Sequence, residues 1–336
     1  ACWKPTTFYK LHKQWYRVAM HGFWGKLPRP FFIQAPMEDV VDAAFLRLIA
    51  RTGKPDAMFT EFTSADGLVL APEAGQRALR AKLMFAPEER PIVAQLFSAI
   101  PERMEKAAAI VADLGFDGID INMGCPDRAV EKSGCGADLI KHPEVARELI
   151  RVAKRGGRGL PVSVKTRMGY NTDEMDTWLP VLLEEGIANL TIHLRTRKEM
   201  SLVPAHWDAM ARAVAIRDRV SPATFITGNG DASDLEDARK KALESGCDGV
   251  MLGRAIYGNP WLFAKHAEPP TPQERVSALI EHIKLFDELL GDISNYATMK
   301  KHFKAYISGW DHAKELRMQL METISAEESL KILAAQ

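Results

Sequence analysis

The chain has 336 residues, of which 46% are hydrophobic and 26% charged, an ordinary composition for a globular protein with a large core. Its 44 basic and 44 acidic residues cancel, so no overall basic field favours a nucleic-acid partner, and any such surface must be local. No apolar run approaches the roughly eighteen residues of a membrane span, and the four cysteines lack the C-x-x-C spacing of zinc sites. We expect no membrane association, no metal site and a cytoplasmic location.

The first thirty residues interleave aromatic and basic side chains, for example Trp3 beside Lys4 and Trp15 near Arg17. A basic amphipathic presequence and a solvated tail are both compatible with this pattern. We favour an extension or a mistranslated leader, because Met20 precedes a plausible natural start. Residues 1–30 are therefore predicted to be an N-terminal extension.

From residue 31 onward, short runs rich in β-branched residues alternate with longer amphipathic patterns. The predicted strands span residues 31–37, 58–62, 92–97, 118–123, 162–168, 189–195, 223–230 and 249–253. The helices predicted between them span residues 43–51, 102–114, 144–154, 173–185, 207–217 and 234–245. Eight such units predict an α/β fold, a closed (β/α)8 TIM barrel over residues 31–267. An open doubly wound sheet is the competing fold, but no G-x-G-x-x-G follows an early strand.

The pattern changes after residue 262. A proline-rich stretch over residues 268–272 predicts a linker, and from Gln273 the apolar spacing is helical to the end of the chain. We therefore predict a small all-helical domain over residues 268–336, packed on or beside the barrel.

The loop after the strand predicted over 118–123 carries the most distinctive group of the chain. It reads Gly124-Cys125-Pro126, and Gly134-Cys135-Gly136-Ala137 begins nine residues after Cys125. Because cysteine is rare here, its place at the end of a core strand predicts a reactive thiol. A buried structural cysteine is the alternative.

Polar residues follow every predicted strand. The carboxyl ends of barrel strands meet at one rim, so these side chains are expected to surround one site. Glycine-bearing turns at Gly228–Asp231 and Gly253–Arg254 follow the last two strands, where backbone N–H groups and Arg254 could hold a phosphate. Tight turns alone are the alternative for these glycines. Lys165 and His193 could polarise an electron-rich ring above the rim.

These motifs, in this order and spacing, resemble the FMN-dependent tRNA-dihydrouridine synthases over roughly residues 31–333. The markers are Ala35-Pro-Met37, Asn122-x-Gly-Cys125-Pro126 with Gly134-x-Gly136-Ala137, Lys165-x-Arg167-x-Gly169, His193-x-Arg195-Thr196-Arg197, Gly228-Asn-Gly-Asp231 and Gly253-Arg-Ala255. The resemblance implies reduction of uridine to 5,6-dihydrouridine in tRNA, with NADPH or NADH as a transient reductant and the chain acting as a monomer.

The resemblance also implies a role for individual residues. Cys125 would be the general acid, and a thiol with an ordinary pKa of about 8.5 is mostly protonated at neutral pH, as that role requires. Asn122 would face the uracil. FMN would be bound by Pro36, Met37, Glu38, Gln95, Lys165, His193, Asn229, Gly230, Asp231, Gly253 and Arg254.

A basic-aromatic segment over residues 299–306 resembles the helix with which the family meets tRNA. Lys300, Lys301, His302 and Lys304, together with Arg197 beyond the sixth strand, are the expected RNA contacts. A solvated lysine face is the alternative. The target base must also be flipped out of the folded tRNA to reach a barrel mouth.

Two positions depart from the family pattern. Leu194 and Asp39 stand where glycine is common, which puts the local backbone geometry in doubt but removes no reacting group. Two other functions remain open. One is a barrel flavoprotein that reduces or oxidises free pyrimidines, and the other is a tRNA-binding protein that has lost catalysis.

Overall fold

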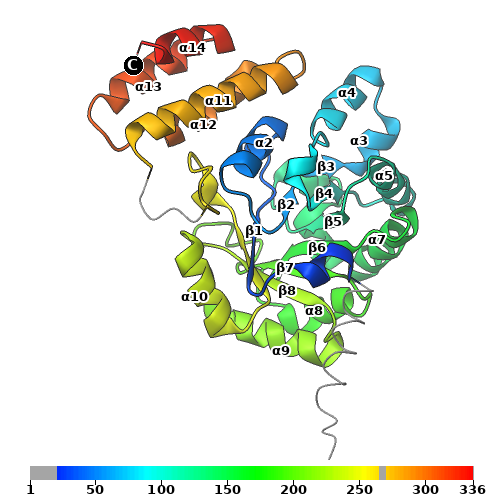
Figure 1. Ribbon diagram of the computed structural model, residues 1–336. Helices are drawn as coiled ribbons and strands as arrows, with labels where there is room; N and C mark the ends of the chain where they lie inside the picture. Colours follow the sequence, from blue (N-terminus) through cyan, green and yellow to red (C-terminus); the bar gives the residue numbers. More distant parts are fainter. Residues whose placement is uncertain (1–20, 265–269, 336) are drawn as a thin grey trace, which may run out of the picture.

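The computed structural model describes residues 21–264 and 270–335 (Figure 1). The first twenty residues of the predicted extension and the predicted domain boundary at 267–268 lie outside this range. The strands are β1 (Phe31–Gln34), β2 (Met58–Phe59), β3 (Thr63–Ser64), β4 (Ile92–Phe97), β5 (Gly118–Met123), β6 (Val162–Arg167), β7 (Asn189–His193), β8 (Phe225–Asn229) and β9 (Gly249–Leu252).

All of these strands are parallel and form one curved sheet in the order β1, β9, β8, β7, β6, β5, β4, β2, with β3 also paired to β4. A bridge between Ile33 and Ala57 and a hydrogen bond from the Asp56 N–H to the Phe32 carbonyl (2.9 Å) join the two ends of this path. The predicted (β/α)8 barrel is confirmed.

The second predicted strand, residues 58–62, is extended only at Met58–Phe59 (β2), and β3 begins one residue after the predicted end. Met58 pairs with Ile92 and Thr63 with Leu96, so five steps along this strand match four along β4. One extra residue must bulge out between the two pairs. The bulge contains Glu61, whose side chain is buried and whose pKa burial raises to about 8.

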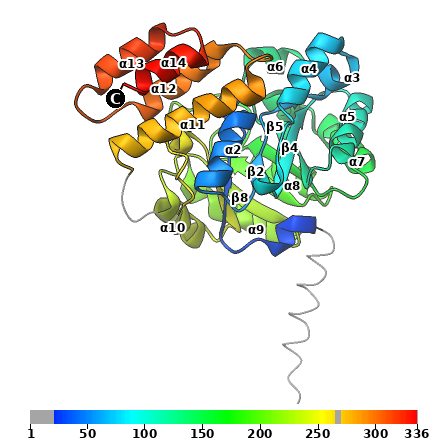
Figure 2. The ribbon, with the colours of Figure 1, turned by 45° about the horizontal axis from the view of Figure 1, so that its top comes forward.

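The helices that alternate with the strands lie on the outside of the barrel (Figures 1 and 2). They are α2 (Ala43–Thr52), α5 (Pro101–Asp113), α7 (Pro143–Gly156), α8 (Met175–Leu183), α9 (Met210–Val220) and α10 (Leu235–Ser245). Their sequence signals are local, as at α2, where the Asp42 carboxylate caps the helix by accepting the Phe45 N–H (2.9 Å).

Several short elements were not predicted. They are α3 (Ala65–Leu70), α4 (Glu73–Ala81), α6 (Arg128–Lys132) and the 3-10 turns η2 (Pro87–Glu89), η3 (Gly136–Lys141) and η5 (Arg254–Ile256). The 3-10 turn η4 (Trp207–Ala209) is the first turn of the helix predicted over residues 207–217. Helix α4 buries only Ala81, and most of its apolar residues are alanines, which give a weak signal beside its charged residues.

Residues 21–30 belong to the barrel rather than to an extension. Trp24 lies in the 3-10 turn η1 (Gly22–Lys26), is 1% exposed, and packs 5.6 Å from Phe31 and 6.3 Å from Phe59 between ring centroids. Phe225 at the start of β8 belongs to the same core cluster. The extension boundary at residue 30 is therefore wrong for this segment, because the apolar amino end of the barrel needs a large side chain to cover it.

The C-terminal segment is helical, as predicted. It consists of α11 (Pro272–Leu290), η6 (Tyr296–Met299), α12 (Lys300–Tyr306), α13 (Ala313–Glu322) and α14 (Ala326–Leu333). Helix α11 lies along α2, which joins the helical domain to the barrel (Figure 2). Within the described residues, no helix is both long and apolar enough to span a bilayer.

Two histidines are buried where the helical domain meets the barrel. His282 of α11 stacks on Phe45 of α2 at 5.0 Å, and the His302 ring lies 4.5 Å from the His282 ring. His302 is 0% exposed and neither of its ring nitrogens has a hydrogen-bond partner among the described residues. The prediction that His302 contacts RNA is therefore wrong, because its apolar neighbours on the inner face of α12 enclose it.

Burial disfavours the charged form of His302 and lowers its pKa to about 4, with Lys301 adding to the shift. In the unfolded chain the same side chain has a pKa of about 6.5, so between about pH 6.5 and about pH 4 it is protonated in the unfolded state and neutral in the folded state. Stability is therefore lost as the pH falls through this window.

We predict that His302→Leu removes this part of the acid sensitivity. Compared with the variant, the wild-type free energy of unfolding should fall by on the order of 2–3 kcal/mol between about pH 6.5 and about pH 4. Urea denaturation across this pH range measures the difference. His312→Asn, which changes an exposed histidine at a positive φ that asparagine tolerates, is the control and should retain the loss of stability at low pH.

Candidate active site

A pocket opens at the carboxyl ends of the strands and gathers most of the predicted cofactor residues. Alternate side chains of each strand face the barrel interior, which brings Lys165, His193 and Asn229 to the same opening although they lie far apart in sequence. The pocket is lined by Ala35, Pro36, Met37, Lys165, His193, Arg195, Ser201, Asn229, Gly230, Asp231, Ala232, Met251, Gly253 and Arg254.

Two of the predicted cofactor residues do not line this pocket. Glu38 points to Lys82 at the end of α4 and forms an ion pair with it. Gln95 is fully buried deeper in the barrel, where its Oε1 accepts a hydrogen bond from Asn122 Nδ2 (3.0 Å).

Lys165 brings a cation into the pocket. Burial, together with the nearby Arg167, lowers the pKa of its ammonium to about 8, so it is mostly protonated at neutral pH. No described residue accepts a hydrogen bond from it, although Asp120 attracts it electrostatically. A buried ammonium that lacks an acceptor and lines a pocket suits an electron-rich ligand there.

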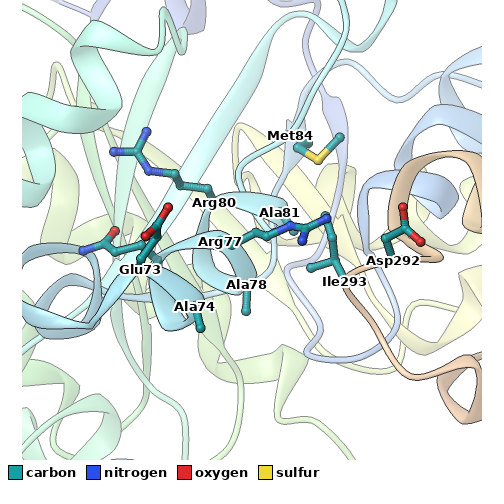
Figure 3. A pocket seen from close by; sticks show the side chains of 10 residues that line it. Glu73, Ala74, Arg77, Ala78, Arg80, Ala81, Met84, Asp292 and Ile293 are labelled. Atoms are coloured by element: carbon teal, nitrogen blue, oxygen red, sulfur yellow. The ribbon is translucent and has the colours of Figure 1, made fainter.

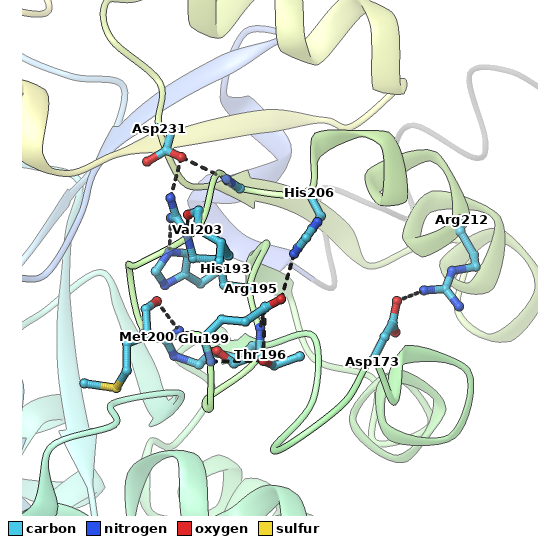
Figure 4. Close-up of polar contacts among 12 residues, drawn as sticks. Asp173, His193, Arg195, Thr196, Glu199, Met200, Val203, His206, Arg212 and Asp231 are labelled. Atoms are coloured by element: carbon cyan, nitrogen blue, oxygen red, sulfur yellow. Dashed lines mark hydrogen bonds and ion pairs between the residues drawn. The ribbon is translucent and has the colours of Figure 1, made fainter.

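His193 is held neutral by its surroundings. Burial and the charges of Lys165, Arg167, Arg195 and Arg254 lower its pKa well below the ordinary value. Arg195 Nη1 donates to His193 Nε2 (3.0 Å), so the remaining proton of the neutral ring is on Nδ1, which is left to donate (Figure 4).

Asp231, after β8, forms ion pairs with Arg195 and Arg254. Its carboxylate pairs with the fully buried Arg195, and its Oδ1 accepts from Arg254 Nη2 (2.6 Å). Arg195 also donates to the carbonyl of Val203 (2.6 Å) in the loop that follows β7 (Figure 4). Both oxygens of Asp231 are thus occupied, and the residue positions its neighbours while Arg254 remains at the surface.

The Cys125 loop is held from two sides. Asn122 Oδ1 accepts the backbone N–H groups of Gly124 (3.1 Å) and Cys125 (2.9 Å), while Arg167 Nε donates to the Gly124 carbonyl (2.7 Å). The Ala137 N–H donates to the Cys125 carbonyl (2.9 Å). This loop, which returns from β5 to η3, therefore has little freedom to move the sulfur.

The Cys125 thiol is partly buried, and burial is the main reason why its pKa is raised. The carboxylate of Asp127 raises it further, while Lys165 and Arg167 act in the opposite direction without reversing the shift. The thiol is therefore protonated at neutral pH, which suits a proton donor and not a nucleophilic thiolate.

The sequence profile described as dihydrouridine synthase matches residues 33–336. The chain belongs to this family. It is 44% identical to a probable tRNA-dihydrouridine synthase of Staphylococcus aureus strain COL, over 93% of this chain and 94% of that protein. It is 45% identical to probable tRNA-dihydrouridine synthase 2 of Bacillus subtilis strain 168, over 93% of this chain and 95% of that protein.

Arg167 and Arg195 do more in this dihydrouridine synthase site than the sequence indicated. Besides Gly124, Arg167 binds the carbonyls of Thr196 (3.0 Å) and Met200 (2.9 Å), joining the Cys125 loop to the β7 loop. Each arginine stands two residues after an inward-facing side chain, Lys165 or His193. That spacing is the signal that could have assigned both arginines to the barrel interior.

The predicted RNA contacts have different surroundings in the structure. Arg197 is engaged by the Glu131 carboxylate, and Lys300 Nζ donates to the Met321 carbonyl (2.7 Å). Lys301 Nζ pairs with Asp39 of the barrel at 2.6 Å. Lys304 is exposed and has no ion-pair partner among the described residues. Of the four basic residues predicted to contact RNA, Lys304 is the one without a partner among the described residues, and Lys301 is half-exposed in an ion pair.

A larger groove of about 840 Å³ runs between α4 and the loop after α11 (Figure 3). Its charged lining residues are Glu73, Arg77, Arg80 and Asp292, which balance one another. Its lining contains no cysteine, histidine or lysine and none of the residues that the sequence predicted for the site.

We predict that Gly136→Ala disrupts the Cys125 loop. Gly136 has a φ of +63°, and an added Cβ would lie 2.6 Å from the Cys125 carbonyl oxygen. The free energy of unfolding should fall by about 2–4 kcal/mol, as measured by denaturant titration.

The matched control is Gly246→Ala, at a φ of +73° with no atom within 4 Å of the added Cβ. It should cost only about 1 kcal/mol, from backbone strain. Equal losses in the two variants would show that the approach to Cys125 is not a close packing contact.

Proposed function

We propose that this chain reduces uridine to 5,6-dihydrouridine in tRNA, using FMN and a transiently bound NADPH or NADH, with Cys125 as general acid. The observation that carries the proposal is the loop after β5, which Asn122 and Arg167 hold by its backbone with the Cys125 thiol on it, while the Lys165 ammonium lines the pocket at the end of β6. Membership of the dihydrouridine synthase family supports the proposal. The cytoplasm, where tRNA substrates are found, is the expected compartment, and a monomer is the expected state.

The residues of the pocket fit FMN. The ammonium of Lys165 and the Nδ1–H of neutral His193 are donors without acceptors among the described residues, and they suit the carbonyl and nitrogen edge of an isoalloxazine. Asn229, Gly230, Asp231, Gly253 and Arg254 form the rim after β8 and β9, where a phosphate is expected in such barrels. Pro36 and Met37 supply an apolar wall.

FMN supplies hydride chemistry to this pocket when it is bound and reduced. The positive charge of Lys165 favours an electron-rich ligand beside it. Cys125 Sγ gives its proton to one carbon of the uracil double bond, and solvent returns a proton to the thiolate afterwards. Asn122 and Arg167 keep the sulfur in place during this transfer, because they bind the backbone on either side of it.

We predict that Cys125→Ala reduces the rate of tRNA reduction by about 100-fold or more, since a positioned general acid contributes about 10²–10⁴-fold. Flavin reduction by NADPH should remain within about twofold of wild type, because no hydride step involves the thiol. Single-turnover assays with unmodified tRNA measure both rates.

Cys247→Ala, at a buried thiol outside the loop, is the matched control and should retain tRNA reduction. Full activity of Cys125→Ala would overturn the assignment of the acid. Reduction of free uracil as efficiently as of tRNA would favour the alternative, a flavoprotein acting on free pyrimidines.

The lysines of α12 are proposed to contact tRNA phosphates. Lys304 is exposed and Lys301 is half-exposed beside the barrel loop that carries Met37. A phosphate would replace Asp39 as the partner of Lys301. Arg197 and Lys300 can contribute only if RNA competes with Glu131 or with the Met321 carbonyl for them.

We predict that Lys304→Met weakens tRNA binding and lowers the slope of log K against log salt by about 0.7–0.9, because one phosphate contact is lost. Filter binding over a range of salt concentrations measures the slope. Lys240→Met on α10 is the control, since it removes an exposed lysine from another part of the barrel. An unchanged slope for Lys304→Met would exclude this residue from the RNA surface.

A further inference from the structure

Four polar side chains form a continuous hydrogen-bonded chain inside the barrel, below the Cys125 loop. Ser163 Oγ donates to Asp120 Oδ1 (2.6 Å), and Gln95 Nε2 donates to Asp120 Oδ2 (2.7 Å). Gln95 Oε1 accepts from Asn122 Nδ2 (3.0 Å), and Asn122 Oδ1 accepts the Cys125 N–H (2.9 Å). Ser163, Asp120 and Gln95 are 0% exposed and Asn122 is 6% exposed, so solvent cannot substitute for these partners.

The direction of each bond depends on Asp120. A side-chain amide can turn its oxygen or its nitrogen to a neighbour, but a carboxylate only accepts hydrogen bonds. Gln95 must therefore turn its nitrogen to Asp120, which leaves its oxygen for Asn122. Asn122 must in turn offer its nitrogen to Gln95, which leaves its oxygen for the backbone of the loop.

We propose that Asp120 is a positioning residue for the general acid: by accepting from Gln95, it sets the orientation of two side-chain amides and through them the backbone of Cys125. The inference rests on the proposed function, in which Cys125 gives the proton. Asp120 and Asn122 both belong to β5, and the Cys125 loop that they orient follows this strand directly.

A second role for Asp120 must be separated from the first. Lys165 on the neighbouring β6 is the charged group that faces Asp120, and the carboxylate favours the charged form of that ammonium. Ser163 and Gln95, its other partners, carry no charge. A variant that removes the carboxylate therefore changes both the electric field and the hydrogen-bond directions, and the experiment must distinguish them.

The test measures alkylation of Cys125 by iodoacetamide in the FMN-loaded enzyme, resolved by peptide mass spectrometry, as a function of pH. The midpoint of the profile reports the pKa of the thiol, and the plateau at high pH reports the access and geometry of the thiolate. Asp120→Asn keeps the shape of the side chain but lets the amide turn either way. Asn122→Asp still accepts from the loop but cannot donate to Gln95. Ser163→Ala removes a donor to Asp120 without affecting the direction of the other bonds.

We expect Asp120→Asn and Asn122→Asp to raise the plateau about fivefold, the equivalent of one lost hydrogen bond of about 1 kcal/mol, and Ser163→Ala to leave it unchanged. Asp120→Asn should also lower kcat for tRNA reduction with little change in KM. Alkylation of the buried Cys247 should remain slow, which shows that the barrel is intact. If Cys247 becomes reactive in Asp120→Asn, that variant has lost the barrel structure, and the plateau of Asn122→Asp then decides whether the proposal holds.

An unchanged plateau, a shifted midpoint alone, or an equal effect of Ser163→Ala would overturn the proposal. A shifted midpoint alone would mean that Asp120 acts only through its charge. The result is independent of the proposed function, because alkylation involves no tRNA. Full activity of Cys125→Ala would instead refute the role of the thiol and leave the positioning of the loop to be judged by the plateau.

Discussion

The site depends on how positive charge is held inside the mouth of the barrel. Lys165, Arg167 and Arg195 face the same interior, where burial lowers the pKa of the Lys165 ammonium and of the Arg167 guanidinium. Arg167 and Arg195 are compensated by backbone carbonyls and by Asp231, which fixes the loops after β5 and β7. Lys165 alone keeps its donors for a ligand. The arginines thus hold loops through compensated contacts, whereas the lysine is left without an acceptor among the described residues.

This arrangement also explains the protonation states of Cys125 and His193. The thiol of Cys125 lies in a field with two cations, yet it remains protonated because burial and Asp127 outweigh them. His193 is neutral for the same reason, surrounded by four positive groups in a site from which water is largely excluded. A neutral thiol and a neutral imidazole beside a charged lysine suit hydride and proton delivery to a base better than nucleophilic attack.

The two departures from the family pattern have separate explanations. Leu194 is fully buried with its side chain in the core outside the barrel, between the inward-facing His193 and Arg195, so it takes no space from the pocket. Asp39 has a φ of +56°, a conformation in which glycine carries no strain. The ion pair of Asp39 with Lys301 joins the loop that carries Met37 to the helical domain. The left-handed backbone conformation of Asp39 thus accompanies an ion pair between the barrel and the helical domain.

The elements that local sequence patterns specify were predicted well, and the features that were missed arise from contacts between segments far apart in the sequence. Strands β4 and β5 were predicted at their observed bounds, because each is a short apolar run with turn residues at both ends. The bulge between β2 and β3 was not predicted, since pairing with β4 creates it. Helix α4 was missed because it buries so little. His302 was assigned to the surface from its lysine neighbours, and only packing against Phe45 reveals its burial.

The amino-acid sequence by itself determined the barrel, the helical segment and the family, because strand periods, turn residues and strand-end motifs are local patterns. The tertiary structure decided which polar groups are free. Gln95 and Asn122 were expected at the cofactor and the uracil, yet their amides are largely used to hold the Cys125 loop. Arg197 and Asp231 are similarly occupied by partners. Hydrogen-bond partners are drawn from distant strands that only closure of the barrel brings together, so no local pattern specifies them.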